Sequence, residues 1–161
     1  MSDRSALLET TLKDRLIDTR KHLEALERAV AEFPNDFGLA DFERAWVGEA
    51  SERLTAYPIQ AGYENVINGC VKVAQELCEL NGWTPANLER KSIEALKHLH
   101  ERGVIGPKTR AALKDAYERR GEVQHDYIGA AARDVHAAAL AVIEHAPLLL
   151  QDVALHLQQR T

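Results

Sequence analysis

Apolar residues recur at helical spacing along almost the whole chain, and this pattern limits the possible folds more than any other feature. The clearest stripe lies between Pro58 and Gly82, where steps of three and four residues separate its members: Ile59, Tyr63, Val66, Cys70, Val73, Leu77 and Leu80. That spacing puts them on one face of an α-helix, whereas a half-buried strand would need alternation every second residue. No segment shows such alternation. We therefore expect an all-α fold.

Prolines and glycines mark the expected ends of the helices. Asp41 is suited to an N-cap, Asn81-Gly82 to a C-terminal glycine cap, and Thr84-Pro85 to the start of a short helix. The expected helical segments are about 4–32, 41–57, 58–81, a short one from 85, 91–101, 107–120 and 126–159. Pro58 is expected to kink or restart its helix, Gly121 to interrupt the next-to-last helix, and Pro147 to kink the last. The chain thus predicts one domain over residues 1–161, a bundle of four to five helices with short connections.

Composition indicates a soluble protein of a reducing compartment. Of 161 residues, 45% are hydrophobic and 28% charged, which is enough for a globular core. The two cysteines, Cys70 and Cys78, would lie about 12 Å apart on one helix, too far for a disulfide. No apolar run reaches 18 residues, and the start Met1-Ser2-Asp3-Arg4 does not resemble a signal peptide. We expect a cytoplasmic protein with no membrane segment.

The charge distribution is uneven. The net charge of −5 argues against a protein that grips nucleic acid over its whole surface, yet residues 89–120 carry nine basic and five acidic side chains. Arg110, Lys114 and Arg119 in this segment are weak candidates for RNA contacts. A solvated helix face explains such a run about as often as a phosphate-binding surface does.

This basic segment leads into the most informative motif, Glu118-Arg119-Arg120-Gly121-Glu122-Val123-Gln124-His125-Asp126-Tyr127. It places Arg120, His125 and Tyr127 in the pattern R-x4-H-x-Y. A guanidinium can hold a phosphate and an imidazole can move a proton, so Arg120 and His125 could form a metal-free site for RNA cleavage. On one continuous helix these two side chains would point about 140° apart, so the site needs a broken turn at Gly121 or a second subunit. Without further support, a surface Arg and a solvated His at a helix junction explain the pair better.

The motif resembles the HepT-like branch of the HEPN superfamily, helical RNases that act as toxins paired with a minimal nucleotidyltransferase antitoxin. The resemblance extends over about residues 57–158. The segment Gly62-Tyr63-Glu64-Asn65-Val66-Ile67-Asn68-Gly69-Cys70 is similar to the family helix that packs against the motif. Residues 1–56 supply further helices of the same bundle. Gly121 stands where the family usually has Asn, and Gln124 where it usually has an apolar residue.

The resemblance implies an activity, a partner and residue roles. The implied function is a metal-independent endoribonuclease toxin in which Arg120 and His125 are catalytic, working as a homodimer on an RNA substrate. Tyr127 is the implied regulatory phenol, adenylylated by a nucleotidyltransferase antitoxin. No cofactor or metal is implied, and His125, His136, His145 and His156 are spaced as scattered surface histidines rather than ligands. The alternative is a non-catalytic helical binding module that partners a nucleotidyltransferase as substrate, regulator or scaffold.

Overall fold

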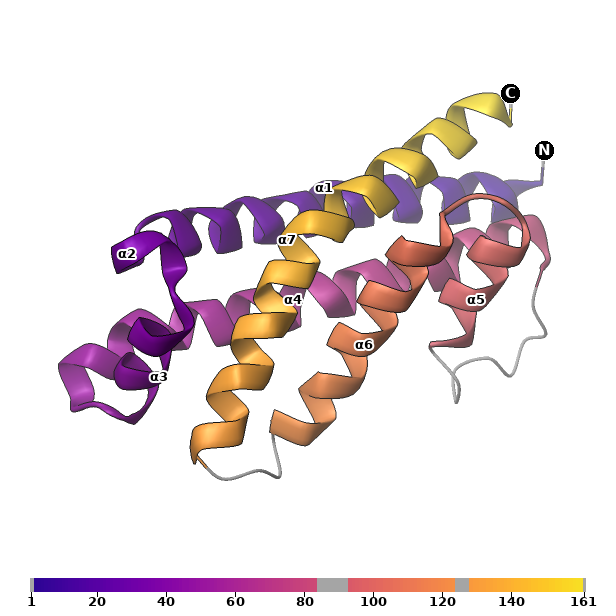
Figure 1. Ribbon diagram of the computed structural model, residues 1–161. Helices are drawn as coiled ribbons and strands as arrows, with labels where there is room; N and C mark the ends of the chain where they lie inside the picture. The colour runs from indigo at the N-terminus through magenta and orange to yellow at the C-terminus, as the bar shows by residue number, and fades with distance from the viewer. Residues whose placement is uncertain (1, 84–92, 124–127, 161) are drawn as a thin grey trace.

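The computed structural model describes residues 2–83, 93–123 and 128–160, and within these ranges all regular structure is helical. The all-α prediction is confirmed. Four long helices form the bundle: α1 (Asp3–Ala31), α4 (Ala50–Asn81), α6 (Pro107–Val123) and α7 (Ile128–Gln159). Figure 1 shows α1 and α4 side by side, with α7 crossing them and α6 next to α7. The short segments α2 (Pro34–Phe37) and α3 (Leu39–Val47) lie at one end of the bundle, and α5 (Glu94–Glu101) at the other.

Helix α4 forms the centre of the bundle. It packs against α1, α3, α5, α6 and α7, and the stripe predicted from its sequence is buried along its whole length. Tyr63 and Ile67 are among the largest fully buried side chains. Asn81 and Gly82 end the helix as predicted, since Gly82 takes a left-handed conformation with φ 68° and the next amide, of Trp83, bonds the carbonyl of Cys78.

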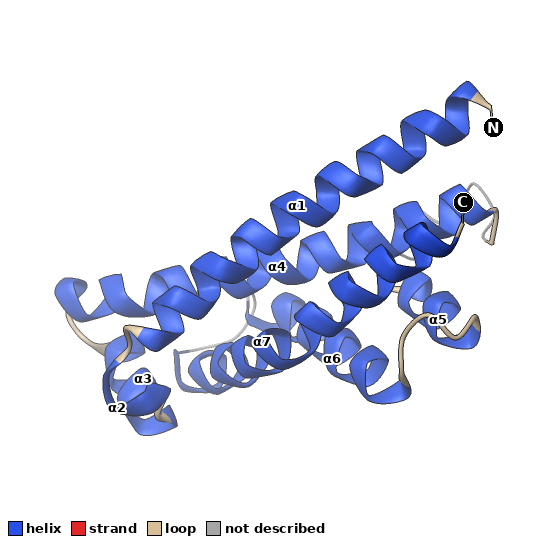
Figure 2. Ribbon diagram, turned by 90° about the horizontal axis from the view of Figure 1, so that it is seen from above, coloured by secondary structure: helices blue, strands red, loops and turns tan. Residues whose placement is uncertain are grey.

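Helices α1 and α4 pack against each other over much of their length, and Figure 2 shows them running alongside each other. A methyl group at Gly69 would lie only 2.8 Å from Cγ2 of the buried Thr19, and one at Gly62 would lie 3.1 Å from Leu26 Cδ1. The two glycines are seven residues apart on α4, and Thr19 and Leu26 are seven residues apart on α1. Two glycines one heptad apart therefore allow the two helix axes to come together.

The expected restart of the helix at Pro58 was wrong, whereas the kinks expected at Pro58 and Pro147 stay predictions. α4 continues through Pro58, and α7 continues through Pro147. A proline deprives the carbonyl four residues earlier of its helical partner. At Pro58 that carbonyl belongs to Leu54, and both residues are exposed, so water can replace the lost donor. Burial of the rest of α4 outweighs the loss.

Three other expected boundaries also differ. α6 runs through Gly121 to Val123, so Gly121 does not interrupt it. A glycine lowers helix stability by only about 0.5–1 kcal/mol relative to Ala, which is too little to end a helix held by its neighbours. α3 begins at Leu39 with Gly38 as its N-cap rather than at Asp41. α5 begins at Glu94, and the short helix expected from Thr84-Pro85 lies outside the described residues.

Segment α2, where a loop was expected after α1, contains a left-handed turn. Asn35, Asp36 and Phe37 have φ of 53°, 56° and 57°, which non-glycine residues rarely adopt. His136 of α7 holds this turn, since its Nε2 lies 2.7 Å from the Phe37 carbonyl oxygen and its ring stacks on Phe37 at 4.4 Å. The prediction that His136 is a scattered surface histidine was therefore wrong. His145 is also tied to a neighbour, with Nδ1 3.2 Å from Thr109 Oγ1.

One described helix, α7, is long and apolar enough over Ala131–Gln159 to cross a membrane by length and composition. Its apolar face packs on α4 and α6 in this bundle, which the core helix of a globular domain also does. A helix of this kind is weak evidence for a membrane span.

We expect Gly69→Ala to destabilise the protein by about 1–3 kcal/mol, because the new methyl group overpacks against Thr19. Urea unfolding followed by circular dichroism measures the effect. Gly106→Ala is the matched control, since a methyl group there meets nothing within 4 Å. Thr19→Ala in the Gly69→Ala background should recover part of the loss, and strict additivity of the two changes would contradict the proposed contact.

Candidate functional site

The R-x4-H-x-Y motif begins on the last turns of α6. Arg119 and Arg120 lie on this helix, as do Arg110 and Lys114. His125 and Tyr127 lie outside the described residues, between α6 and α7. Of the expected site, the structure therefore describes the two arginines on α6 and the residues of α4 and α7 that contact them.

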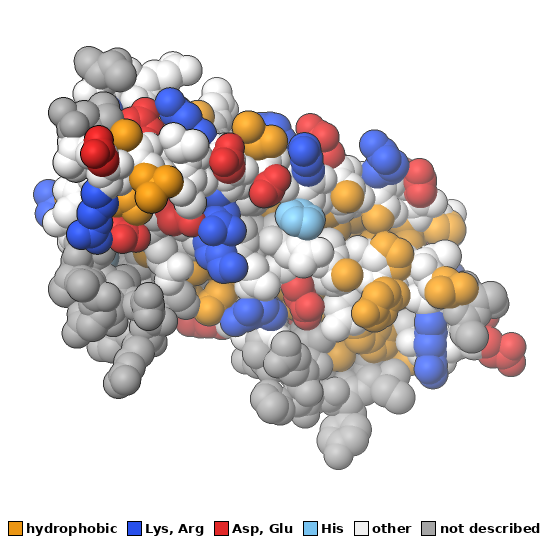
Figure 3. All heavy atoms as spheres, turned by 180° about the vertical axis from the view of Figure 1, so that it is seen from behind, with side chains coloured by type: hydrophobic (Ala, Val, Ile, Leu, Met, Phe, Trp, Pro, Cys, Tyr) orange, Lys and Arg blue, Asp and Glu red, His pale blue; other side chains and the backbone are white. Residues whose placement is uncertain are grey.

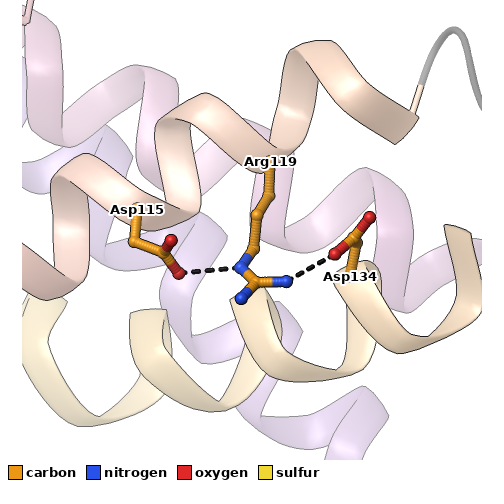
Figure 4. A network of polar contacts seen from close by, with 3 residues as sticks. All are labelled: Asp115, Arg119 and Asp134. Carbon is orange, nitrogen blue, oxygen red and sulfur yellow. Dashed lines mark hydrogen bonds and ion pairs between the residues drawn. The ribbon is translucent and has the colours of Figure 1, made fainter. Parts of the chain in front are cut away.

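Arg119 links α6 to α7 through two carboxylates. Its Nε donates to Asp115 Oδ2 at 2.7 Å, and its Nη1 bonds Asp134 Oδ1 on α7. Figure 4 shows the guanidinium between the two acidic side chains. The hydrogen bond to Asp115 raises the pKa of Arg119, and the charges of Asp115 and Asp134 add to this, against the effect of burial. The positive charge of Arg119 is thus balanced within the protein, and the residue fixes the start of α7 beside α6.

The adjacent Arg120 has a different environment. Its Nη1 donates to Asn68 Oδ1 of α4 at 2.8 Å, and its guanidinium carbon lies 4.4 Å from the centre of the Tyr117 ring. Among the described residues, its partners are a neutral amide and an aromatic face, and none of their carboxylates forms an ion pair with it. Its Nε is buried without a partner from the described residues. Among the described residues, Arg120 is therefore held by uncharged groups.

Two further polar groups of α4 lie in this region. The Tyr63 side chain is fully buried, and its hydroxyl and the Glu64 Oε1 atom have no hydrogen-bond partner among the described residues. Burial raises the pKa of Tyr63 well above its usual range; Glu64 and Asp134 add to this, whereas Arg120 and Arg119 oppose it. The phenol stays neutral, and the charges that act on it belong to three helices. The segment of α4 expected to pack against the motif does so through Asn68.

Other basic residues of α6 have weaker surroundings. Lys114 pairs with Glu118 at 3.9 Å, and both side chains are about half exposed. Arg110 is partly buried on the same helix. A role of Arg110, Lys114 and Arg119 in RNA binding stays a prediction, and for Arg119 it would require a charge already shared by two carboxylates.

The sequence alone did not single out Asn68, Tyr117 or Asp134. Tyr117 lies three residues before Arg120, so both face the same side of α6, and this spacing was a usable signal. Asn68 and Asp134 depend on how α4 and α7 pack against α6, which no local pattern reveals. Within the described part of the chain, no group of three or more His, Cys, Asp or Glu residues could hold a metal ion.

Both cysteines are buried thiols on α4. Cys70 and Cys78 are both free and buried, and burial raises the pKa of each thiol to about 12. Neither forms the reactive thiolate at neutral pH.

A groove between α3 and α7 is separate from the surroundings of Arg119 and Arg120. It is lined by residues of α3 and the first part of α7: Leu39, Ala40, Glu43, Arg44, Val47 and Ala132. Figure 3 shows apolar side chains gathering toward the end of the molecule where α3 and the start of α4 lie, whereas acidic and basic side chains are interspersed elsewhere on that face.

Comparisons with known proteins identify no relative. No family model, curated protein or solved structure matches this chain.

We expect loss of the Arg119–Asp134 link to weaken the packing of α7 on α6. Asp134→Asn should lower the free energy of unfolding by about 1–2 kcal/mol, because Arg119 is only partly exposed and keeps a single carboxylate. Asp115→Asn, which removes an exposed pair within α6, should change it by less than about 0.5 kcal/mol. Urea denaturation compares the two variants, and equal effects would contradict a special role of the link between helices.

Proposed function

We propose that this protein is a metal-independent endoribonuclease of the HEPN type, HepT-like, and that it acts as a toxin. RNA is its substrate, and the site includes Arg120 and His125. The proposal combines the R-x4-H-x-Y motif of the sequence with the environment of the first of these residues.

The observation that carries the proposal is the contrast between the two adjacent arginines. Arg119 is balanced by Asp115 and Asp134, whereas Arg120 contacts the neutral Asn68 amide and the Tyr117 ring. A guanidinium whose contacts within the described part of the chain are uncharged can attract an anion, and its planar array of donors suits phosphate oxygens. An arginine needed only for stability would more often pair with a carboxylate.

The chemistry assigned to this site is attack of an RNA 2′-hydroxyl on its own phosphorus. The new bond joins the 2′-oxygen to phosphorus, and the bond to the 5′-oxygen of the next nucleotide breaks. The products are a 2′,3′-cyclic phosphate and a 5′-hydroxyl. His125 accepts the 2′-proton, and Arg120 stabilises the charge on the non-bridging oxygens. An acid must also protonate the leaving 5′-oxygen.

A homodimer would supply that acid as the His125 of a second copy. Three exposed leucines on one side of α7, namely Leu140, Leu148 and Leu155, would be available for such a contact. An active monomer at micromolar concentration by light scattering would contradict the shared site.

A non-catalytic binding module is the second candidate. The continuation of α6 through Gly121 to Val123 favours it, since no break at Gly121 turns Arg120 and His125 toward each other. Such a module would still partner a nucleotidyltransferase, as its substrate, regulator or scaffold.

Catalysis is tested with purified protein and RNA in EDTA. We expect wild-type cleavage with 2′,3′-cyclic phosphate ends, and a loss of at least about 100-fold in His125→Ala and Arg120→Ala. Arg120→Lys keeps the charge but not the planar fork, so its activity should also fall strongly.

The matched control is Arg28→Ala, which removes an exposed arginine of α1 and should leave the rate unchanged. Circular dichroism verifies that each variant is folded. An inactive wild type, or wild-type rates in His125→Ala, would favour the binding module.

We further propose that a minimal nucleotidyltransferase antitoxin adenylylates Tyr127: the phenol oxygen attacks the α-phosphorus of ATP, and pyrophosphate leaves. The added phosphate would carry negative charge two residues from His125 and repel an RNA backbone approaching Arg120. Intact-mass spectrometry after co-expression with such an enzyme should show one added adenylyl group, absent in Tyr127→Phe. Full neutralisation of the Tyr127→Phe protein by the partner would mean that the partner acts by binding alone.

A further inference from the structure

Asn68 is the one hydrogen-bond partner of the Arg120 side chain among the described residues, although the two residues are far apart in the sequence. The Asn68 Oδ1 atom accepts from Arg120 Nη1 at 2.8 Å, and both side chains are partly buried between α4 and α6. Hydrogen bonds between a charged donor and a buried acceptor are worth more than exposed ones, because water competes less well for either group.

The Tyr117 ring restrains the same guanidinium from another direction. The guanidinium carbon lies over the Tyr117 ring, 4.4 Å from the ring centre, where cation and ring attract each other. The amide at one Nη atom and the ring beside the guanidinium carbon together limit rotation about the last bonds of the side chain.

The chemical type of the acceptor matters. An amide oxygen orients a guanidinium without cancelling its charge, whereas a carboxylate would do both. The contrast is present one residue away, where Arg119 is held by Asp115 and Asp134. The residue that follows Arg120 on α6 is Gly121, which has no side chain that could orient the guanidinium.

We propose that Asn68 is the positioning residue of the site: it orients Arg120 toward the phosphate of the substrate while preserving its positive charge. This inference rests on the proposed function for its catalytic consequence. Its structural part, the orientation of Arg120 by a neutral amide, can be tested without any activity.

The first test uses nuclear magnetic resonance of protein labelled with ¹⁵N-arginine. In the wild type, the Arg120 guanidinium should show restricted rotation about its Nε–Cζ bond, with the signals assigned from their absence in Arg120→Lys. Asn68→Leu keeps a side chain of similar shape without the acceptor, so rotation should become fast. Addition of inorganic phosphate should shift the wild-type Arg120 signals more than those of Asn68→Leu.

The matched control is at the other end of the same helix. Asn81 Oδ1 accepts from Arg160 Nη1 at 2.6 Å, so Asn81→Leu removes a second Asn–Arg hydrogen bond of α4. It should leave the Arg120 signals and the activity unchanged. Equal Arg120 dynamics in the wild type and Asn68→Leu would overturn the inference.

The second test separates orientation from charge through RNA cleavage. Asn68→Leu should lower kcat by about 100-fold with little change in KM, because misplacement of a catalytic group affects mainly the transition state. Asn68→Asp keeps an acceptor for Arg120 and should preserve the melting temperature. Its carboxylate nevertheless cancels the charge, so phosphate binding and kcat/KM should both fall.

The outcomes distinguish the inference from the function on which it rests. An active wild type whose Asn68→Leu and Asn68→Asp variants are equally active would overturn the positioning role and leave the nuclease intact. A wild type that cleaves no RNA would overturn the nuclease, and the NMR comparison would still decide whether Asn68 orients Arg120.

Discussion

Burial of α4 on almost every side is the constraint on which the rest of the structure depends. Five other helices pack against it, and α1 lies close to it where Gly62 and Gly69 lack side chains. Apolar burial contributes roughly 25 cal/mol for each Å² removed from water, so a helix covered on this scale is held far more firmly than its own propensity allows. This explains why Pro58 fails to break it. It also gives Asn68, on the same helix, a fixed place from which to contact α6.

The fold was largely predictable because the dominant signal is periodic. The stripe of α4, the glycine cap at Gly82 and the last long helix follow directly from spacing and from the chemistry of glycine. The errors concern local breaking signals at Pro58 and Gly121, where tertiary packing outweighed a loss of one hydrogen bond or about 1 kcal/mol of propensity. The turn at 35–37 could not be foreseen, since its left-handed conformation depends on His136 from a helix a hundred residues later.

The sequence predicted only those residues of the candidate site that lie close together in the chain. Arg120 stood out through the motif, yet its sequence neighbour Arg119 carries the same charge and the same side chain. Only the surroundings separate them: carboxylates from α6 and α7 in one case, an amide and a ring in the other. Partners supplied by other helices determine whether a charge is available to a ligand. A one-dimensional pattern does not contain that information.

The left-handed turn at Asn35–Phe37 has a consequence for how this chain can vary. Backbone in that region costs of order 1 kcal/mol or more at each non-glycine residue, and the contacts of Phe37 with Phe33, Phe42 and His136 must offset it. The turn therefore belongs to the core, although it connects two helices as a surface loop would. Insertions or deletions there would shift the register between α3 and α7 and so displace the start of the helix that follows the motif. Variants of this sequence should therefore keep the number of residues in this turn more strictly than in an ordinary loop between helices.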